Sequence, residues 1–278
     1  VDKTTAEGYV AISLNNDGAG NAATGSVVTI NGGKIIAKDE NGEASTAVRV
    51  ETTATVTVSA ETEVVGDTKY ECAIVTYEGS TDFYSFDNLQ DAINKAIETN
   101  GKVVLINNIT IDEKLTISDS VVIDGNGFTI TYTGSDRAID IPVNADKKVN
   151  VTLTNLTVDC TASYCQRGIN YNDDGALVLN KVTVKGTNVT YALNLPGYSD
   201  NCVVTITDSN FSGNIALNVW GEDAKINATN TTFTAVDNNT AEGYAAVKLN
   251  NDGTTSANGT VINITGGKID VTGSACAD

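Results

Sequence analysis

Histidine and methionine are absent from this chain of 278 residues, and proline is nearly so, with Pro142 and Pro196 its only occurrences. Without histidine, the chain cannot form a Ser-His-Asp triad, a histidine general base or an imidazole metal site. Because it begins with Val1 and contains no methionine, we interpret it as a processed product or an excised piece. Two proline residues are also too few for a proline-rich stalk.

Basic residues are scarce. Lys and Arg total 17 against 35 Asp and Glu, which gives a formal net charge of −18. A surface of this sign repels phosphate backbones and anionic lipid, so we expect neither nucleic-acid binding nor membrane association. No stretch approaches the roughly 20 apolar residues that span a bilayer, so membrane insertion is not expected. A secreted or cell-surface protein fits this composition.

Large aromatic residues are also few, with five Phe, ten Tyr and one Trp. The apolar content is mainly Val, Ile, Leu and Ala, accompanied by many Thr, Asn and Gly. This mixture favours strands and tight turns over helices. The composition therefore indicates an all-β protein.

The five cysteines form no CxxC pair, and without histidine a zinc site of the usual Cys/His kind is not expected. Cys160 and Cys165 bracket the short loop CTASYC, where a disulfide and two buried thiols are both open alternatives. The odd number leaves at least one thiol unpaired or paired between chains.

A four-residue strand motif recurs along the chain: a small residue, an aliphatic residue, a variable residue and a large apolar residue. Its copies begin at Ala11, Ala47, Ala138, Gly168, Ala192, Ala216 and Ala246. A second motif follows most copies, with two apolar residues at alternate positions, four spacers and another apolar residue. The spacers, such as NGGK, DGNG, TDSN and TGGK, are rich in residues that tolerate the left-handed backbone conformation.

Short strands joined by such turns, with no helix-length segment between them, predict a parallel β-helix, a solenoid of stacked coils. Strand alternation places the aliphatic positions inside and the variable positions in an outward row. That row comprises Ser13, Arg49, Asp140, Asn170, Asn194, Asn218 and Lys248. We expect Asn170, Asn194 and Asn218 to stack as a ladder of amides on consecutive coils, although separate solvated side chains are the alternative.

One helix is expected over residues 87–99. Asp87-Asn88-Leu89-Gln90 resembles a capping box with Asp in place of Ser or Thr. An apolar stripe follows, and Asn100-Gly101 ends the helix. We expect this helix to cover an open end of the solenoid.

Residues 70–130 resemble the opening of the pectate-lyase-like right-handed β-helix superfamily. The resemblance lies in a strand pair, YECAIVTYEGSTDFYSF, a capping helix, LQDAINKAI, and the segments VVLINNITI and IDGNGFTI. It implies an all-β, right-handed parallel β-helix with one short capping helix, of the kind found in large bacterial surface repeat proteins. The same fold hosts lyases, hydrolases, adhesins and inert stalks, so it does not fix an activity.

A longer repeat joins the two ends of the chain. TAEGY, NNDG and GSVVTINGGKI in the first 35 residues return near the end as TAEGY, NNDG and GTVINITGGKI. We therefore predict that residues 1–66 are closing coils of a preceding repeat, that residues 67–100 hold the strand pair and capping helix, and that residues 101–278 form further coils. Copies would then associate head to tail, with Cys276 near the junction. The alternative is that residues 1–66 pack on their own chain.

The sequence argues against catalysis. The GHG and RxK segments of polygalacturonase-like enzymes are missing, and only three Arg are present. Arg167 lies near the acidic pair Asp173-Asp174 in the sequence, but such a surface pair is usually a simple ion pair. We therefore expect no enzyme activity.

Two sets of residues are candidates for ligand binding. The acidic turns NNDG, NDDG and NNDG contain Asp17, Asp173, Asp174 and Asp252. We expect no cofactor. Calcium is the one ion that these turns are suited to bind, although ordinary turn chemistry is the favoured alternative. An aromatic strip for stacking on surface glycans would comprise Tyr171, Tyr191, Tyr198 and Trp220. The favoured alternative is that these side chains cover loop surface.

These patterns together predict an extracellular structural or adhesive β-helix module of a cell-surface or filament-forming repeat protein. The alternative is a β-helix that binds or cleaves polysaccharide as a lyase or hydrolase.

Overall fold

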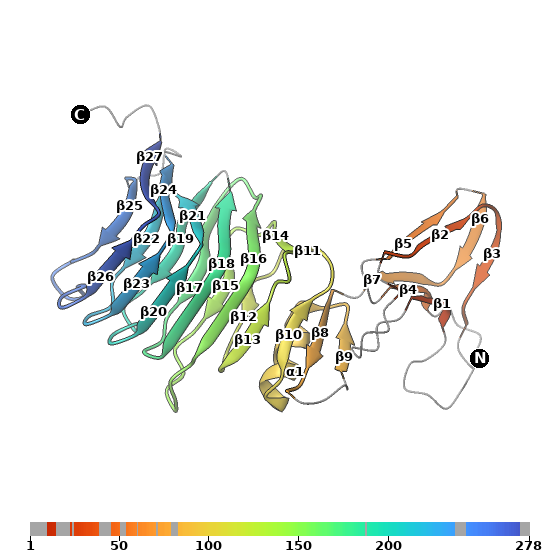
Figure 1. The fold of residues 1–278 in the computed structure, drawn as a ribbon, viewed down its shortest axis with the longest axis horizontal. Helices are drawn as coiled ribbons and strands as arrows, with labels where there is room; N and C mark the ends of the chain where they lie inside the picture. The colour runs from red at the N-terminus through yellow and green to blue at the C-terminus, as the bar shows by residue number, and fades with distance from the viewer. Residues whose placement is uncertain are drawn as a thin grey trace. The chain divides into compact units, whose positions relative to one another are not determined.

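The computed structural model describes residues 10–14, 23, 25–38, 46–50, 54–59, 61–70, 72–78, 83–186, 188–236 and 243–272. These residues form an all-β structure of mainly parallel strands, with α1 as its one helix (Figure 1). The contacts divide the chain into two units, residues 1–92 with 104–107 and residues 93–103 with 108–278.

The first unit contains three parallel ladders. Their strands are β1 (Val10–Leu14), β4 (Thr46–Val50) and β7 (Asp67–Tyr70), then β2 (Val27–Ile30) and β5 (Thr55–Val58), then β3 (Gly33–Ile36) and β6 (Thr62–Val65). The coil of β1, β2 and β3 thus lies against the coil of β4, β5 and β6. The ladder continues beyond residue 66, because β7 pairs with β4. An antiparallel pair follows, formed by β8 (Ala73–Thr76) and β9 (Phe83–Phe86).

The core of these first coils is aliphatic. Register pairs Ile12 with Val48 and Leu14 with Val50. Val48 and Val50 are fully buried, and the partly buried Ile12 and Leu14 pack against the same cluster. Like side chains therefore stack on like side chains from one coil to the next, as the short repeat predicts.

The second unit is built on longer parallel ladders. One runs through β13 (Val121–Asp124), β16 (Val151–Cys160), β18 (Ala176–Gly186), β20 (Val203–Thr207), β23 (Lys225–Thr229) and β26 (Val261–Thr265). Beside it lie β11 (Ile109–Ile111) and β14 (Thr129–Tyr132), then β21 (Asn210–Gly213), β24 (Thr232–Val236) and β27 (Lys268–Thr272). A six-stranded sheet has β12 (Leu115–Thr116), β15 (Arg137–Ile141), β17 (Cys165–Tyr171), β19 (Val189–Leu195), β22 (Ile215–Val219) and β25 (Ala245–Leu249).

Corners between the ladders are set by residues with positive φ. Asn155, Lys181, Asp208 and Asn230 have φ angles of 48°, 55°, 49° and 50°. Each occupies the second of the four spacer positions in the second sequence motif. A left-handed residue bends the chain, and Asn and Asp adopt this conformation at low cost. Asn155 and Lys181 lie within β16 and β18, whereas Asp208 and Asn230 lie between consecutive strands. The prediction that these spacers are left-handed turns is confirmed.

The amide ladder forms, but it is buried. The side-chain Nδ2 of Asn170 donates to Asp140 Oδ1, that of Asn194 to Asn170 Oδ1 and that of Asn218 to Asn194 Oδ1, each over 2.7 Å. Asn250 adds a further bond of 2.7 Å to Asn218 Oδ1. The five residues are at most 6% exposed.

The predicted outward row is therefore wrong for Asp140, Asn170, Asn194 and Asn218. Strict alternation assumes that one face of each strand meets solvent, whereas all five residues of β22 are buried. Of the remaining positions in that row, Ser13 is exposed, and Arg49 and Lys248 are half-buried.

The helix α1 (Leu89–Thr99) begins two residues later than predicted. Asn88 is its N-cap, because Asn88 Oδ1 accepts hydrogen bonds from the backbone N–H of Gln90 at 2.8 Å and Asp91 at 3.2 Å. The predicted assignment of this role to Asp87 is wrong. Asn100 then adopts a φ of 53° and ends the helix, as predicted. Coverage of a solenoid end by α1 stays a prediction.

Two elements, α1 and β10 (Lys102–Leu105), contain residues of both units. The apolar stripe of α1 is buried, with Leu89, Ala92, Ile93 and Ala96 at most 2% exposed. Within the described residues, no helix has the length and apolar character needed to cross a membrane.

Candidate functional site

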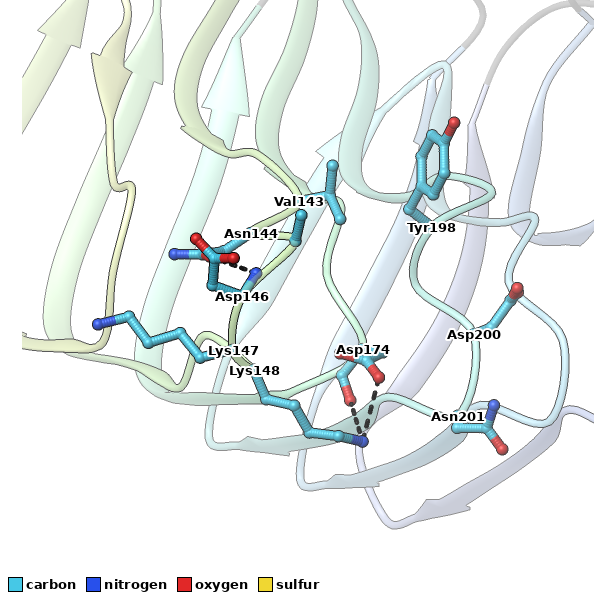
Figure 2. Close-up of a pocket in the computed structure, with 10 residues that line it drawn as sticks. Val143, Asn144, Asp146, Lys147, Lys148, Asp174, Tyr198, Asp200 and Asn201 are labelled. Atoms are coloured by element: carbon cyan, nitrogen blue, oxygen red, sulfur yellow. Dashed lines mark hydrogen bonds and ion pairs between the residues drawn. The ribbon is translucent and has the colours of Figure 1, made fainter.

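A groove of about 460 Å³ lies where three loops of the second unit come together (Figure 2). The loops follow β15, β17 and β19, which are neighbours in the six-stranded sheet. The lining residues are Val143, Asn144, Ala145, Asp146, Lys147, Lys148, Asp174, Tyr198, Asp200 and Asn201. Parallel strands end at the same edge of a sheet, so their following loops meet there.

Asp173 holds two of these loops together. Its Oδ1 accepts the backbone N–H of Val149 at 2.7 Å and that of Gly175 at 2.9 Å, and its Oδ2 accepts that of Asn144 at 3.0 Å. The residue has no exposed surface. The carboxylate therefore fastens the loop after β15 onto the turn after β17, and so shapes one wall of the groove.

Tyr171 supports the same wall from within. It is fully buried, and its hydroxyl donates to the carbonyl oxygen of Val149 over 2.7 Å. Burial raises the pKa of this phenol above its ordinary value. Tyr171 therefore cannot stack on a glycan, and its predicted ligand-binding role is wrong.

Tyr198 is the one predicted aromatic residue that lines the groove. It is 67% exposed and shares this lining with Val143, which is 45% exposed. Tyr191 and Trp220 are half-buried and are not among the groove residues. The structure thus reduces the predicted aromatic strip to a single exposed ring beside an exposed aliphatic side chain.

Charged side chains line most of the rest of the groove. Lys148 Nζ donates to the backbone carbonyl of Asp174 at 3.3 Å and lies 3.1 Å from Asp174 Oδ2. Figure 2 draws these two contacts as dashed lines. Lys147 pairs with Asp119 Oδ2 at 2.5 Å, and this hydrogen bond lowers the pKa of the Asp119 carboxyl. Asp200 Oδ1 accepts the backbone N–H of Glu222 at 2.6 Å. The groove therefore offers carboxylates and ammonium groups beside one aromatic ring.

The predicted calcium ligands are occupied by local partners. Asp173 accepts three backbone N–H groups, which occupy the oxygens that a cation would need. Asp252 Oδ1 accepts the backbone N–H of Thr254 and of Thr255, and these bonds lower its pKa. Asp174 is paired with Lys148. Asp17 lies outside the described residues.

No group of three or more metal-binding side chains lies together in the described part of the chain. The four described cysteines, Cys72, Cys160, Cys165 and Cys202, are buried free thiols. Cys160 and Cys165 hydrogen-bond to each other, which raises the pKa of Cys160 and lowers that of Cys165. The structure thus shows the buried-thiol alternative for this pair, while Cys276 lies outside the described residues.

The comparisons with known proteins give no relative. No family model, curated protein or solved structure matches the chain. The resemblance to pectate-lyase-like proteins accordingly stays a prediction.

Sequence reasoning missed most of the groove. The loop of residues 142–150 belongs to neither short repeat, so no sequence motif indicated Val143 or Lys148 as binding residues. Its one local signal is Pro142, which interrupts the chain directly after β15. In repeat proteins, insertions between copies of a repeat form loops on one face, which is often the binding face.

Proposed function

We propose that this chain is a structural or adhesive module of a secreted or cell-surface protein, built as a right-handed parallel β-helix of the pectate-lyase-like kind. The observation that carries the proposal is the order in which the chain visits its ladders. It passes from β18 to β19, then through β20, β21 and β22, and then through β23, β24 and β25. Each round adds one strand to each ladder, and this order supports a solenoid.

Handedness follows from general strand geometry. A connection between parallel strands of one sheet is right-handed in about 98% of cases, because strand twist favours that crossover. The acidic surface, with its net charge of −18, keeps such a molecule soluble and opposes nonspecific association with nucleic acid. A rigid, soluble solenoid suits a spacer or a scaffold that presents loops.

A second candidate, polysaccharide binding, is supported by the groove. Sugar rings stack on exposed aromatic faces and hydrogen-bond to carboxylate and amide groups. Tyr198, Asp200 and Asn201 lie together there. Cleavage is not proposed, because the sequence lacks the polygalacturonase segments and any histidine.

The absence of turnover is the first prediction. We expect no release of unsaturated or reducing ends when the chain is incubated with acidic polysaccharides, with and without added calcium. Absorbance of unsaturated products and a reducing-sugar assay measure the two reaction types. Turnover that disappears in Asp174→Asn would refute the non-catalytic module and establish the groove as an active site.

The second prediction separates the adhesive module from the inert spacer. If the groove binds glycans, Tyr198→Ala should abolish binding on a glycan array while leaving the unfolding curve unchanged, because Tyr198 is 67% exposed. The matched control is Tyr164→Ala, which removes another exposed tyrosine, 44% accessible, that does not line the groove. Binding that survives Tyr198→Ala would exclude the groove, and an array without any signal favours the spacer.

A further inference from the structure

Two coils of this chain follow the same path. One contains β1, β2 and β3, and the other contains β25, β26 and β27; their sequences are the two copies of the long repeat. Glycines with positive φ occupy equivalent places in both, at 74°, 91° and 90° in the first coil and 70°, 70° and 77° in the second. They are Gly25, Gly32 and Gly33, and Gly259, Gly266 and Gly267. Since such residues fix where a coil turns, the two coils have the same turn geometry.

The two coils differ in which side is covered. Strands β1, β2 and β3 pair with the strands that follow them, β4, β5 and β6. Strands β25, β26 and β27 pair with strands that precede them, β22, β23 and β24. Within the described residues, the following side of the last coil and the preceding side of the first coil have no strand partner.

The uncovered side of the last coil exposes apolar residues that the equivalent coil buries. Ile269 is 57% exposed, whereas its counterpart Ile35 is 4% exposed. Val271 is 45% exposed, and the equivalent Ala37 is 4% exposed. The first coil thus shows that the same surface is buried once another coil covers it.

Backbone hydrogen-bonding groups also indicate that this edge can accept another coil. The Val261 N–H donates to Ala224 on the preceding side. Alternate residues of a parallel strand direct their N–H and C=O groups to opposite neighbours, so those of Ile262 and Ile264 face the uncovered side. In the first coil, Ile30 is equivalent to Ile264, and its carbonyl accepts the Ser59 N–H at 2.9 Å from the covering coil.

We infer that the edge formed by β25, β26 and β27 binds the coil of β1, β2 and β3 from a second copy of this chain, head to tail. The inference depends on the proposed β-helix, because it extends the same stacking across a molecular boundary. It places Ile12 on Val247, Ile30 on Ile264 and Ile35 on Ile269. Aliphatic residues stack on aliphatic residues at these positions within the chain as well, as Leu217 with Val247 and Ile12 with Val48.

The occupant is a second copy because its coil repeats the turns of the coil that it would cover. Consecutive coils of a solenoid must turn in phase for their ladders to continue. The edges that meet are different surfaces, so contact at one edge does not block the other. Because stacked coils follow one another along a single axis, this heterologous contact does not close into a ring, and it extends into filaments.

Sedimentation velocity and electron microscopy of the full chain test this contact. We expect particles that lengthen with concentration. Ile269→Lys combined with Val271→Lys should weaken association by about tenfold or more, since two charges would be buried without partners. The matched control is Val203→Lys, which places a lysine at an equally exposed valine, 42% accessible, on an inner strand. A wild-type chain that stays monomeric, or a double variant that associates as well as Val203→Lys, overturns the inference.

A cross-link fixes the register. In head-to-tail stacking, Thr29 of one copy lies beside Asn263 of the other, within the 4.4 to about 6.8 Å between Cα atoms that a disulfide requires. Both residues are exposed. Mixing Thr29→Cys with Asn263→Cys, each also carrying Cys276→Ser, should give a disulfide-linked mixed dimer.

Two outcomes of the cross-linking would overturn the inference. One is the absence of a mixed dimer, and the other is a chain carrying both cysteines that cross-links only within itself, which would show that residues 10–36 cover their own chain. Failure of this contact leaves the non-catalytic module intact. Polysaccharide turnover would instead refute the proposed function without affecting the association.

Discussion

Replacing Asn194 by Ala should lower the free energy of unfolding by about 2 to 4 kcal/mol. Asn194 is in the middle of the buried ladder, where it donates to Asn170 and accepts from Asn218. Its removal leaves the oxygen of one neighbour and the amide hydrogen of the other without partners. Each buried unsatisfied group costs about 1 to 3 kcal/mol, and the alanine side chain forms no hydrogen bond that would compensate. Chemical denaturation followed by circular dichroism measures the loss.

The chain supplies a matched control for this result. Asn263 Nδ2 donates to Asn227 Oδ1 over 3.0 Å in a second amide pair, which also joins neighbouring coils but is exposed. Asn227→Ala should cost less than about 1 kcal/mol, because water replaces the lost bond. Equal losses for Asn194→Ala and Asn227→Ala would show that burial is not what makes the ladder important.

The ladder has one direction, and Asp140 sets it. An ionised carboxylate can only accept hydrogen bonds, so Asn170 must present its amide nitrogen to Asp140 and its oxygen to the next coil. The same orientation then passes along the ladder to Asn250. Arg137 at 3.1 Å and Lys114 at 3.4 Å accompany the other oxygen of Asp140, which compensates the charge at this end. The row of hydrogen-bonded amides therefore begins at an ion-paired carboxylate.

Sequence patterns predicted the strands and their turns because those features are local. The spacing of apolar residues marks each strand, and Asn155 or Asp208 in a spacer marks each corner. Burial of the ladder was not predictable in this way. The alternation rule gives every strand a solvent face, and only packing in three dimensions shows that a strand such as β22 has none.

The candidate site also depends on contacts between distant parts of the sequence, which local patterns do not show. Asp173 and Asp174 are adjacent and chemically identical, and no pattern in NDDG separates them. What separates them is the loop after β15, about 25 residues earlier in the chain, which offers two backbone N–H groups to Asp173 and Lys148 to Asp174. Tyr171 was misassigned for a related reason, because its hydroxyl partner Val149 belongs to that same loop.

Replacing Asp173 by Ala should destabilise the fold strongly, whereas replacing Asp174 by Ala should barely affect it. Loss of Asp173 strips three backbone N–H groups of their acceptor at a site with no exposed surface. Water that enters the vacated space will hydrogen-bond to some of these N–H groups. We therefore expect a loss of about 3 to 5 kcal/mol in the free energy of unfolding.

Asp174, 47% exposed at its side chain, makes a surface ion pair with Lys148, and such pairs contribute about 0 to 1 kcal/mol. The two variants remove the same charge from adjacent positions, so their difference isolates the buried clamp. Denaturation of both, with calcium and with chelator, gives the comparison. If Asp173 acts as a clamp, calcium should leave the wild-type curve unchanged. Calcium-dependent stability that is lost in Asp173→Ala would show instead that this carboxylate is a metal ligand and that its three N–H contacts give way on binding.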